Sequence, residues 1–468
     1  MRILIVQFVP FGRSPPLPRF DHELGVAAAM LRQEGFELAL LPADGYRPEA
    51  LHQAINLHRP DQVLVDIPPT SITAAHRTIV DVAEKHFLPV TVVGIRATCR
   101  PREAISIPGV AALVVGEYDR AVVELLRCLR DGADPAGTGE KPAVAGVWVN
   151  SEDGLVRGEP APLADDLDAL PPSDRELFDT AGTVAASGEI DFQATRGCPW
   201  WCAFCLNDWY MDLYAAAGPL HRRRSIGGLL DEVSAVVRRY DRARRVRFVD
   251  HPFAADIDWL ADFAHDYPRR CALPYRCHVP LSALDQRVPA MLARSGCETV
   301  SVEVGSGSRF IREEVLGLRM TRQQIVRGVA ALKAEGLRVE GSVFVGAPYE
   351  SEVSIDETID LLARLDLDAL RARVYYPVPG TRSAEICAEN GWISGRGEEN
   401  FHANRSVLDM PSLAPGQIDD IAARLETLVR RRRTGSVWSW LRRMRKLAAK
   451  PLRLRRAKRP PGGSTRRR

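Results

Sequence analysis

The sequence lacks any long hydrophobic run. No stretch of eighteen or more apolar residues occurs in its 468 residues, so no transmembrane helix is expected. The apolar N-terminus, residues 1–6, is short and leads into a polar and proline-rich segment. This pattern is typical of a buried first strand rather than a signal peptide. We therefore expect a cytoplasmic protein.

A disulfide framework is also missing. The nine cysteines are odd in number and follow no secretion signal. Three of them, Cys198, Cys202 and Cys205, fall within eight residues, which indicates metal or redox chemistry. The others are scattered and are expected to be small core residues: Cys99, Cys128, Cys271, Cys277, Cys297 and Cys387.

Acidic residues are absent from the C-terminal end. Residues 430–468 hold 17 of the lysines and arginines, which leaves 46 basic against 60 acidic residues elsewhere. The net charge of +3 therefore conceals an acidic body and a basic tail. We expect residues 435–468 to form a short helix and a disordered extension. An amphipathic helix for an anionic membrane surface or nucleic acid is the alternative, but no nucleic-acid substrate is expected.

The length predicts at least two domains. Residues 1–135 alternate short apolar runs with helical patterns, which predicts a doubly wound α/β domain with its ligand beyond the carboxyl ends of the strands. Residues 136–183 are expected to be a linker with a small hairpin that turns at Asp153–Gly154. The alternation resumes over 184–405 and predicts a full or partial (β/α) barrel. Residues 406–434 are expected to be helical.

The segment 195–205 holds the three clustered cysteines. Thiolates at this spacing fit in one loop, and three of them leave one iron of a [4Fe-4S] cluster free for an outside ligand. A structural zinc site is the alternative, but it needs four protein ligands, and no second cysteine pair or nearby histidine pattern follows. The position after the first strand of a βα series favours the cluster.

With Phe204 directly before the third cysteine, this C-x-x-x-C-x-x-C segment resembles the signature of radical S-adenosylmethionine (SAM) enzymes. The resemblance implies that Cys198, Cys202 and Cys205 bind the cluster. It implies that the free iron binds the amino and carboxylate groups of SAM, with Phe204 near the adenine. It also implies an electron donor such as a flavodoxin or ferredoxin.

Four downstream segments resemble the same family, in the family's order. Residues 302–308 resemble the strand and turn that contact SAM, which implies contacts from Glu303 and Ser306. Gly305 stands where the family usually has glutamate, and a plain Gly/Ser turn is the alternative.

The other three segments are also turns after strands. Residues 341–351 resemble the strand and Gly-x-Pro turn beside adenine, which implies contacts from Gly346 and Pro348. Residues 248–253 resemble an Asp-Asp-x-Phe segment with histidine at the second position. Residues 375–381 resemble the Pro-x-Pro-Gly-Thr of the last barrel strand.

A doubly wound domain before such a barrel resembles the cobalamin-dependent subfamily. The resemblance implies that cobalamin lies near residues that follow the later strands: Thr70, Ser71, Gly94, Gly116 and Glu117. His22 matches only part of the Asp-x-His-x-x-Gly pattern that supplies a cobalt ligand in some relatives. The alternatives are that His22 is a polar residue at a helix start and that the domain has lost cobalamin.

Three functions stay open from the sequence. The first is a cobalamin-dependent radical SAM methyltransferase that methylates an unactivated carbon of a small, natural-product-like molecule. The second is a radical cyclase or rearrangement enzyme that uses the same cofactors without methyl transfer. The third is a cobalamin- or cluster-binding sensor without turnover, against which the set of SAM-contact motifs argues.

Overall fold

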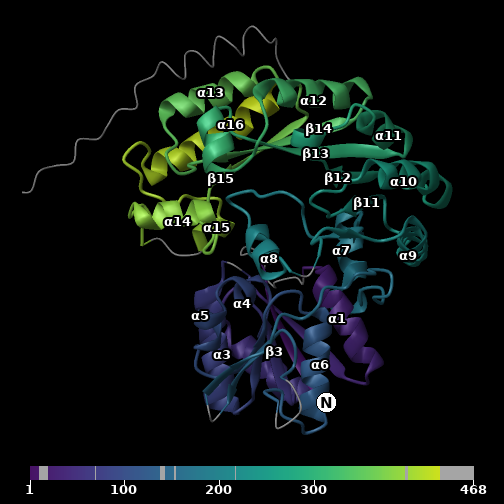
Figure 1. Cartoon of the computed structure of the whole chain (residues 1–468), viewed down its shortest axis with the longest axis vertical. Helices are drawn as coiled ribbons and strands as arrows, with labels where there is room; N and C mark the ends of the chain where they lie inside the picture. The colour runs from purple at the N-terminus through teal and green to yellow at the C-terminus, as the bar shows by residue number, and fades with distance from the viewer. Residues whose placement is uncertain are drawn as a thin grey trace, which may run out of the picture.

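The computed structural model describes residues 1–9, 19–68, 70–137, 143–151, 154–216, 218–395 and 399–432. Figure 1 shows two α/β parts, with the N-terminal part below and a curved C-terminal part above it. The basic segment expected at 435–468 lies outside the described residues. In the part of the chain that the structure describes, no helix is long and apolar enough to cross a membrane.

A seven-stranded sheet forms the N-terminal part, in the order β2-β1-β3-β4-β5-β6-β7. Its first five strands are parallel, and β1 pairs with both β2 and β3, so the order reverses at β1 as in a doubly wound fold. The strands are β1 (Arg2–Phe8), β2 (Glu37–Ala43), β3 (Gln62–Asp66), β4 (Val90–Val93), β5 (Val110–Val114), β6 (Val147–Ser151) and β7 (Gly154–Arg157). The helices are α1 (His22–Gln33), α2 (Pro48–His58), α3 (Ile72–His86), α4 (Ile95–Cys99), α5 (Pro101–Ile105) and α6 (Asp119–Arg130).

Both faces of this sheet are buried. Side chains alternate along each strand, so Val63 and Val65 of β3 enter one core while Leu64 enters the other. Helices α2 and α3 close the first core, and α1 and α6 close the second. This burial explains the nearly continuous apolar runs of the first 115 residues.

The expected linker over 136–183 is wrong in its first part. Its hairpin is present as β6 and β7, but β6 pairs antiparallel with β5, so both strands extend the N-terminal sheet. The physical reason is that β5 would otherwise leave a bare sheet edge. Only residues after Arg157 connect the two parts, through the 3-10 helix η1 (Glu176–Phe178) and helix α7 (Thr180–Ser187).

The C-terminal part is an open, parallel six-stranded sheet in the order β15-β14-β13-β12-β11-β8. Sequential order with a helix after most strands is the arrangement of a partial (β/α) barrel. The strands are β8 (Glu189–Phe192), β11 (Arg245–Phe248), β12 (Tyr275–His278), β13 (Cys297–Gly305), β14 (Arg338–Val345) and β15 (Ala369–Val374). The main helices are α9 (Ile226–Arg239), α10 (Ile257–Arg270), α11 (Val288–Arg294), α12 (Arg322–Ala334), α13 (Glu352–Leu362) and α14 (Arg382–Glu389).

Smaller elements complete this part. A two-stranded ribbon, a helix at the domain junction and short turns lie between the main elements: β9 (Thr195–Arg196), β10 (Arg222–Arg223), α8 (Asn207–Leu213), η2 (Leu281–Ala283), the π-helix η3 (Phe310–Val315) and α15 (Glu399–His402). Strand β12 was not expected, because its sequence Tyr-Arg-Cys-His is short and polar. The last strand ends at Val374, directly before the Pro-x-Pro-Gly-Thr segment of residues 375–381.

The helical segment expected over 406–434 is only partly helical. Helix α16 (Pro415–Arg432) begins nine residues later than expected and packs on β15 and β14. The preceding residues are held in an extended path, because Leu408 bridges to Ile393 and the Ser406 amide donates to Asp419 at 2.7 Å.

Candidate active site

The three clustered cysteines lie in one loop between β9 and α8. The Cys205 amide donates to the Cys202 carbonyl at 2.8 Å, which forms a tight turn. The Asn207 side-chain amide donates to the carbonyls of Cys198 (2.9 Å) and Trp200 (3.1 Å) and ties the start of the loop to its end. The Asn207 backbone N–H points to the Cys205 sulfur at 3.5 Å. Asn207 was missed from the sequence, because it follows the motif and belongs to the next helix.

The thiols interact electrostatically with one another. Burial is the largest cause that raises the pKa of Cys198 to about 11 and that of Cys202 to about 12. The charges of Cys205 and Cys198 raise the pKa of Cys202 further, as does Glu303. Deprotonation therefore requires a cation, and an iron–sulfur cluster supplies it.

The donor set fits a cluster with three protein ligands. In the described ranges, no three side chains of His, Cys, Asp or Glu converge closely enough to hold a single metal ion. A cubane instead binds thiolates at separate iron corners. Ligation of a cluster by Cys198, Cys202 and Cys205 stays a prediction.

Two neighbouring segments hold the cysteine loop in place. The Ala203 amide donates to the Leu316 carbonyl at 3.0 Å, and a Cβ on Gly317 would lie 2.9 Å from the Ala203 nitrogen. On the other side, the Ser383 amide and hydroxyl both donate to the Ala203 carbonyl, at 2.9 and 3.0 Å. The Trp209 indole donates to the Gly380 carbonyl at 2.7 Å. The Pro-x-Pro-Gly-Thr segment thus contacts the loop region, while Gly317 carried no recognisable signal in the sequence.

Phe204 faces the barrel strands. Its ring lies 4.7 Å from that of Phe344 on β14. The turn after β14 contains Gly346, which has a positive φ of 81°, and the buried Pro348. The Gly346 amide donates to the Glu350 carboxyl at 2.5 Å, and burial raises the pKa of Glu350 to about 8. The predicted adenine neighbours Phe204, Gly346 and Pro348 thus flank one strand, and their SAM contacts stay predictions.

Glu303 and Ser306 lie in different surroundings. The Glu303 carboxylate accepts from the Gly305 amide (3.0 Å) and the Ser342 hydroxyl (2.9 Å) and pairs with Arg373 at 3.3 Å. Burial raises the pKa of Glu303, and Arg373 opposes that change. Ser306 is fully buried, and its hydroxyl lies 3.2 Å from that of Thr358. Glu303 is near the cysteine loop, whereas Ser306 supports a turn.

Asp250 has a structural role. Its carboxylate accepts hydrogen bonds from the amides of Ala194 and Thr195 and from the Thr195 hydroxyl, at 2.6–3.1 Å. Burial raises its pKa to about 6 despite these bonds. Asp250 therefore fixes the strand that leads into the cysteine loop.

Glu117 joins the two parts of the molecule. Its carboxylate pairs with Arg196 at 3.2 Å and with Arg222, both from the barrel part. Arg196 also pairs with Asp119 at 2.8 Å, and the Glu117 amide donates to the Tyr214 hydroxyl at 2.9 Å. These charged side chains are largely buried. Arg196 lies two residues before the first cysteine, so this network links the N-terminal part to the loop, and a cobalamin contact from Glu117 stays a prediction.

The other residues predicted to contact cobalamin follow three neighbouring strands at the carboxyl edge of the N-terminal sheet: Thr70, Ser71, Gly94 and Gly116. The two glycines have positive φ angles of 95° and 92°. A Cβ on Gly94 would collide with the Asp66 carboxyl, and one on Gly116 would collide with the Tyr214 hydroxyl. The Asp66 carboxyl and the Tyr214 hydroxyl thus already require glycine at these two positions. Close approach of the cobalamin macrocycle to the backbone there stays a prediction.

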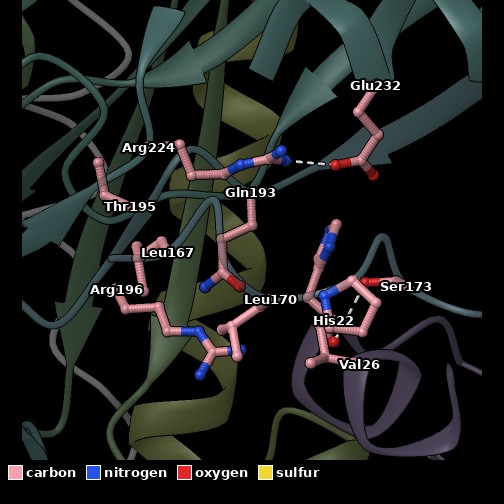
Figure 2. Close-up of a pocket in the computed structure, with 11 residues that line it drawn as sticks. His22, Val26, Leu167, Leu170, Ser173, Gln193, Thr195, Arg196, Arg224 and Glu232 are labelled. Atoms are coloured by element: carbon pink, nitrogen blue, oxygen red, sulfur yellow. Dashed lines mark hydrogen bonds and ion pairs between the residues drawn. The ribbon is translucent and has the colours of Figure 1, made fainter. Parts of the chain in front are cut away.

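His22 lies in a pocket between α1 and the barrel part (Figure 2). Its Nε2 atom is buried and has no hydrogen-bond partner among the described residues. Burial, followed by the charge of Arg175, lowers the pKa of His22 well below its usual value, so the ring is neutral. Figure 2 shows Gln193, Leu170 and Arg196 on the other walls. An unpartnered nitrogen at the carboxyl edge of the sheet fits a ligand there, and cobalt ligation by His22 stays the less favoured alternative to a polar residue at a helix start.

A doubly wound domain joined to a partial barrel with a three-cysteine loop defines a two-domain iron–sulfur protein. Family models match both parts: the B12 binding domain over residues 21–126 and the Radical SAM superfamily over residues 192–362. The chain belongs to the cobalamin-dependent radical SAM enzymes. Their cofactors are cobalamin, a [4Fe-4S] cluster and SAM.

Two curated relatives align along much of the chain. An uncharacterized methyltransferase of Pyrococcus horikoshii is 26% identical over 317 residues, which cover 67% of this chain and 66% of the relative. The anaerobic magnesium-protoporphyrin IX monomethyl ester cyclase of Rubrivivax gelatinosus is 22% identical over 344 residues, covering 71% and 59%. The chain thus spans just under two thirds of the first relative and less of the second.

A solved structure shares the whole architecture. The radical SAM methyltransferase TsrM of Kitasatospora setae, with tryptophan substrate and a SAM analog bound, superimposes with a TM-score of 0.65 at 19% identity. The match covers 84% of this chain and 77% of TsrM. A second TsrM structure, with cobalamin and a [4Fe-4S] cluster bound, gives the same score. At this identity the likeness establishes the fold.

Proposed function

We propose that this protein is a methyltransferase that transfers a methyl group to an unactivated carbon of a small molecule. The single observation that carries the proposal is the cysteine loop, which Arg196 and its partners Glu117 and Asp119 link to the carboxyl edge of the cobalamin-binding domain. When bound, SAM and the cluster supply a 5′-deoxyadenosyl radical, and cobalamin supplies the methyl group.

The chain's own residues hold and shield this site. Cys198, Cys202 and Cys205 bind the cluster, and Asn207 closes their loop. The aromatic rings of Phe204 and Phe344 pack against each other beside the cysteine loop, and apolar side chains there help to exclude water from reactive species. The names of the Pyrococcus relative and of TsrM support methyl transfer. A flavodoxin or ferredoxin would deliver the electron.

The test is product analysis under anaerobic conditions. The full chain is reconstituted with iron, sulfide and cobalamin, and SAM and a strong reductant are added. We expect 5′-deoxyadenosine and about one equivalent of S-adenosylhomocysteine per cobalamin before any substrate is added, since cobalamin itself accepts the first methyl group. Cys202→Ala should lose the cluster's visible absorbance and both products. Cys128→Ala, outside the loop, should keep all three.

A second function is favoured by one observation, the alignment with the magnesium-protoporphyrin ester cyclase. Deoxyadenosine without S-adenosylhomocysteine would contradict methyl transfer and favour that cyclase alternative. Neither product, with the cluster's absorbance intact, would favour the sensor.

A further inference from the structure

Most charges on the concave face of the barrel are paired. Arg247 of β11 forms a two-contact pair with Asp191 of β8, and Arg276 of β12 pairs with Glu340 of β14 at 2.6 Å. These four side chains lie within their strands. They satisfy one another and leave no group that calls for a ligand.

Three side chains nearer the carboxyl ends behave differently. His251 follows β11, His278 ends β12, and Arg373 comes from β15. The two imidazole rings lie 4.3 Å apart, tilted by 36°. Arg373 is held by the Ser342 hydroxyl at 3.1 Å and by Glu303 at 3.3 Å, both through its Nη2 atom. The three side chains come from strands far apart in the sequence and converge on one lumen.

Their remaining nitrogens are unsatisfied. Among the described residues, no hydrogen-bond partner contacts the ring nitrogens of His251 or His278, or Nη1 and Nε of Arg373. His251 is exposed, His278 is half-buried, and the Arg373 side chain is 43% exposed. In the part of the chain that the structure describes, Nε of Arg373 is buried without a partner, and a buried polar group normally has one. The other nitrogens of the three side chains are accessible to a ligand.

Arg373 is the charged side chain of this group, and the two histidines beside it are neutral. Burial lowers the pKa of His278 to about 3, with further lowering by His251 and Arg373. Desolvation by the surrounding protein atoms, followed by the charge of Arg373, also lowers the pKa of His251 although part of the ring is exposed. Both rings are therefore neutral at pH 7, and each offers one N–H donor. Glu303 neutralises Arg373 through one nitrogen only, so the unpaired side of the guanidinium suits an anionic oxygen.

We propose that Arg373, His251 and His278 bind a carboxylate of the substrate in the barrel lumen. The proposal rests on the proposed function and adds to it a substrate class, small molecules that carry a carboxylate. The family resemblance implies that the SAM carboxylate binds the free iron of the cluster. We therefore assign an anion beside the histidine pair to the substrate. Glu303 acts electrostatically on Cys202 and also pairs with Arg373 at 3.3 Å, so the proposed anion site borders the expected SAM site.

Benzoate and its neutral analogue benzamide test this proposal. The full chain with its oxidised cluster is labelled with ¹⁵N-histidine, and the ring-nitrogen chemical shifts of each imidazole are followed at pH 7 while either probe is added at constant ionic strength. His251→Asn and His278→Gln assign the two resonances. We expect benzoate to change the ¹⁵N chemical shift of His278, since the neutral ring donates its N–H to the anion. Benzamide should change it little.

Arg373→Gln should weaken benzoate binding by about tenfold or more, the effect of losing a charged hydrogen bond. The matched control is Arg371→Gln, because Arg371 is an exposed arginine two residues away on the same strand. The affinity of the Arg371→Gln variant for benzoate should stay within about twofold of that of the parent protein. If Arg373→Gln fails to fold, the His278→Gln variant should still show weaker benzoate binding by equilibrium dialysis.

Three results would overturn the proposal: no response to benzoate, an equal response to benzamide, or equal effects of the two arginine variants.

Saturation with SAM distinguishes a substrate carboxylate from the SAM carboxylate as the anion that binds at this site. Unchanged benzoate binding supports a substrate carboxylate, whereas displacement by SAM but not by decarboxylated SAM would assign the anion site to SAM. The probe binds without turnover. If both SAM products form and benzoate gives no response, this inference alone is refuted. If benzoate binds as expected and S-adenosylhomocysteine does not form, only methyl transfer is refuted.

Discussion

The two sheets of this protein differ in what their faces contact. In the N-terminal sheet, neighbouring residues of β3 enter two apolar cores, one on each face. In the barrel sheet, alternate residues of β11 are buried under helices (Val246, Phe248) or face the lumen as charges (Arg245, Arg247). The first sheet is buried on both faces. The second sheet is buried on the face that the helices cover, and its other face lines the lumen.

This difference follows from curvature. A doubly wound sheet has a layer of helices on each face, so both faces must be apolar. An open barrel has helices only on its convex face, and its concave face stays available for ligands. Charges on that concave face are tolerated because each is exposed enough to stay hydrated or is paired. A charge should therefore be far more harmful in the first sheet than in the second.

The largest effect is expected for Val65→Asp. Val65 is fully buried in the central strand β3, and an unpaired carboxylate there should destabilise the fold by about 4 kcal/mol or more. Urea unfolding followed by circular dichroism would measure it. The same substitution at Val353, which is 72% exposed on α13, is the control and should be nearly neutral. Equal losses at both positions would contradict the two-sided core.

The sequence predicted the first sheet better than the second. Continuous apolar runs such as residues 63–65 identify strands buried on both faces without further information. The alternation Arg245–Phe248 is just as regular, but a sequence cannot tell whether a polar stripe faces bulk water or a lumen. Strand β12 was missed for the same reason, since half of its residues face the lumen.

The site was predictable only where its residues are neighbours in sequence. The spacing of Cys198, Cys202 and Cys205 identified the loop. Long-range contacts could not be read in this way: Gly317 against the loop, Tyr214 against Gly116, and Arg373 beside His251. The hairpin was recognised, but its pairing with β5 depends on an edge that only the folded sheet defines.

An intermediate effect is expected where the two parts meet. Glu117→Gln would leave Arg222 without its carboxylate partner and Arg196 with only Asp119. Loss of one buried charged hydrogen-bond partner should cost about 1–3 kcal/mol. It should also loosen the contact between the parts, measured as faster proteolysis of the connection 158–188. Glu176→Gln, which removes an exposed pair with Arg239, is the control. Unchanged proteolysis would show that other contacts hold the parts together.

The smallest effect is expected in the lumen itself. Arg247 is 46% exposed and bonds Asp191 through Nε at 2.7 Å and through a second, shorter contact. An exposed ion pair contributes at most about 1 kcal/mol, so Arg247→Gln, Asp191→Asn and the double variant should all unfold near the urea concentration of the parent. A double-mutant cycle gives the pair's coupling energy directly. If the coupling approached the loss expected for Val65→Asp, the concave face would have to be a packed layer like the N-terminal sheet, and the lumen would not be open to a substrate.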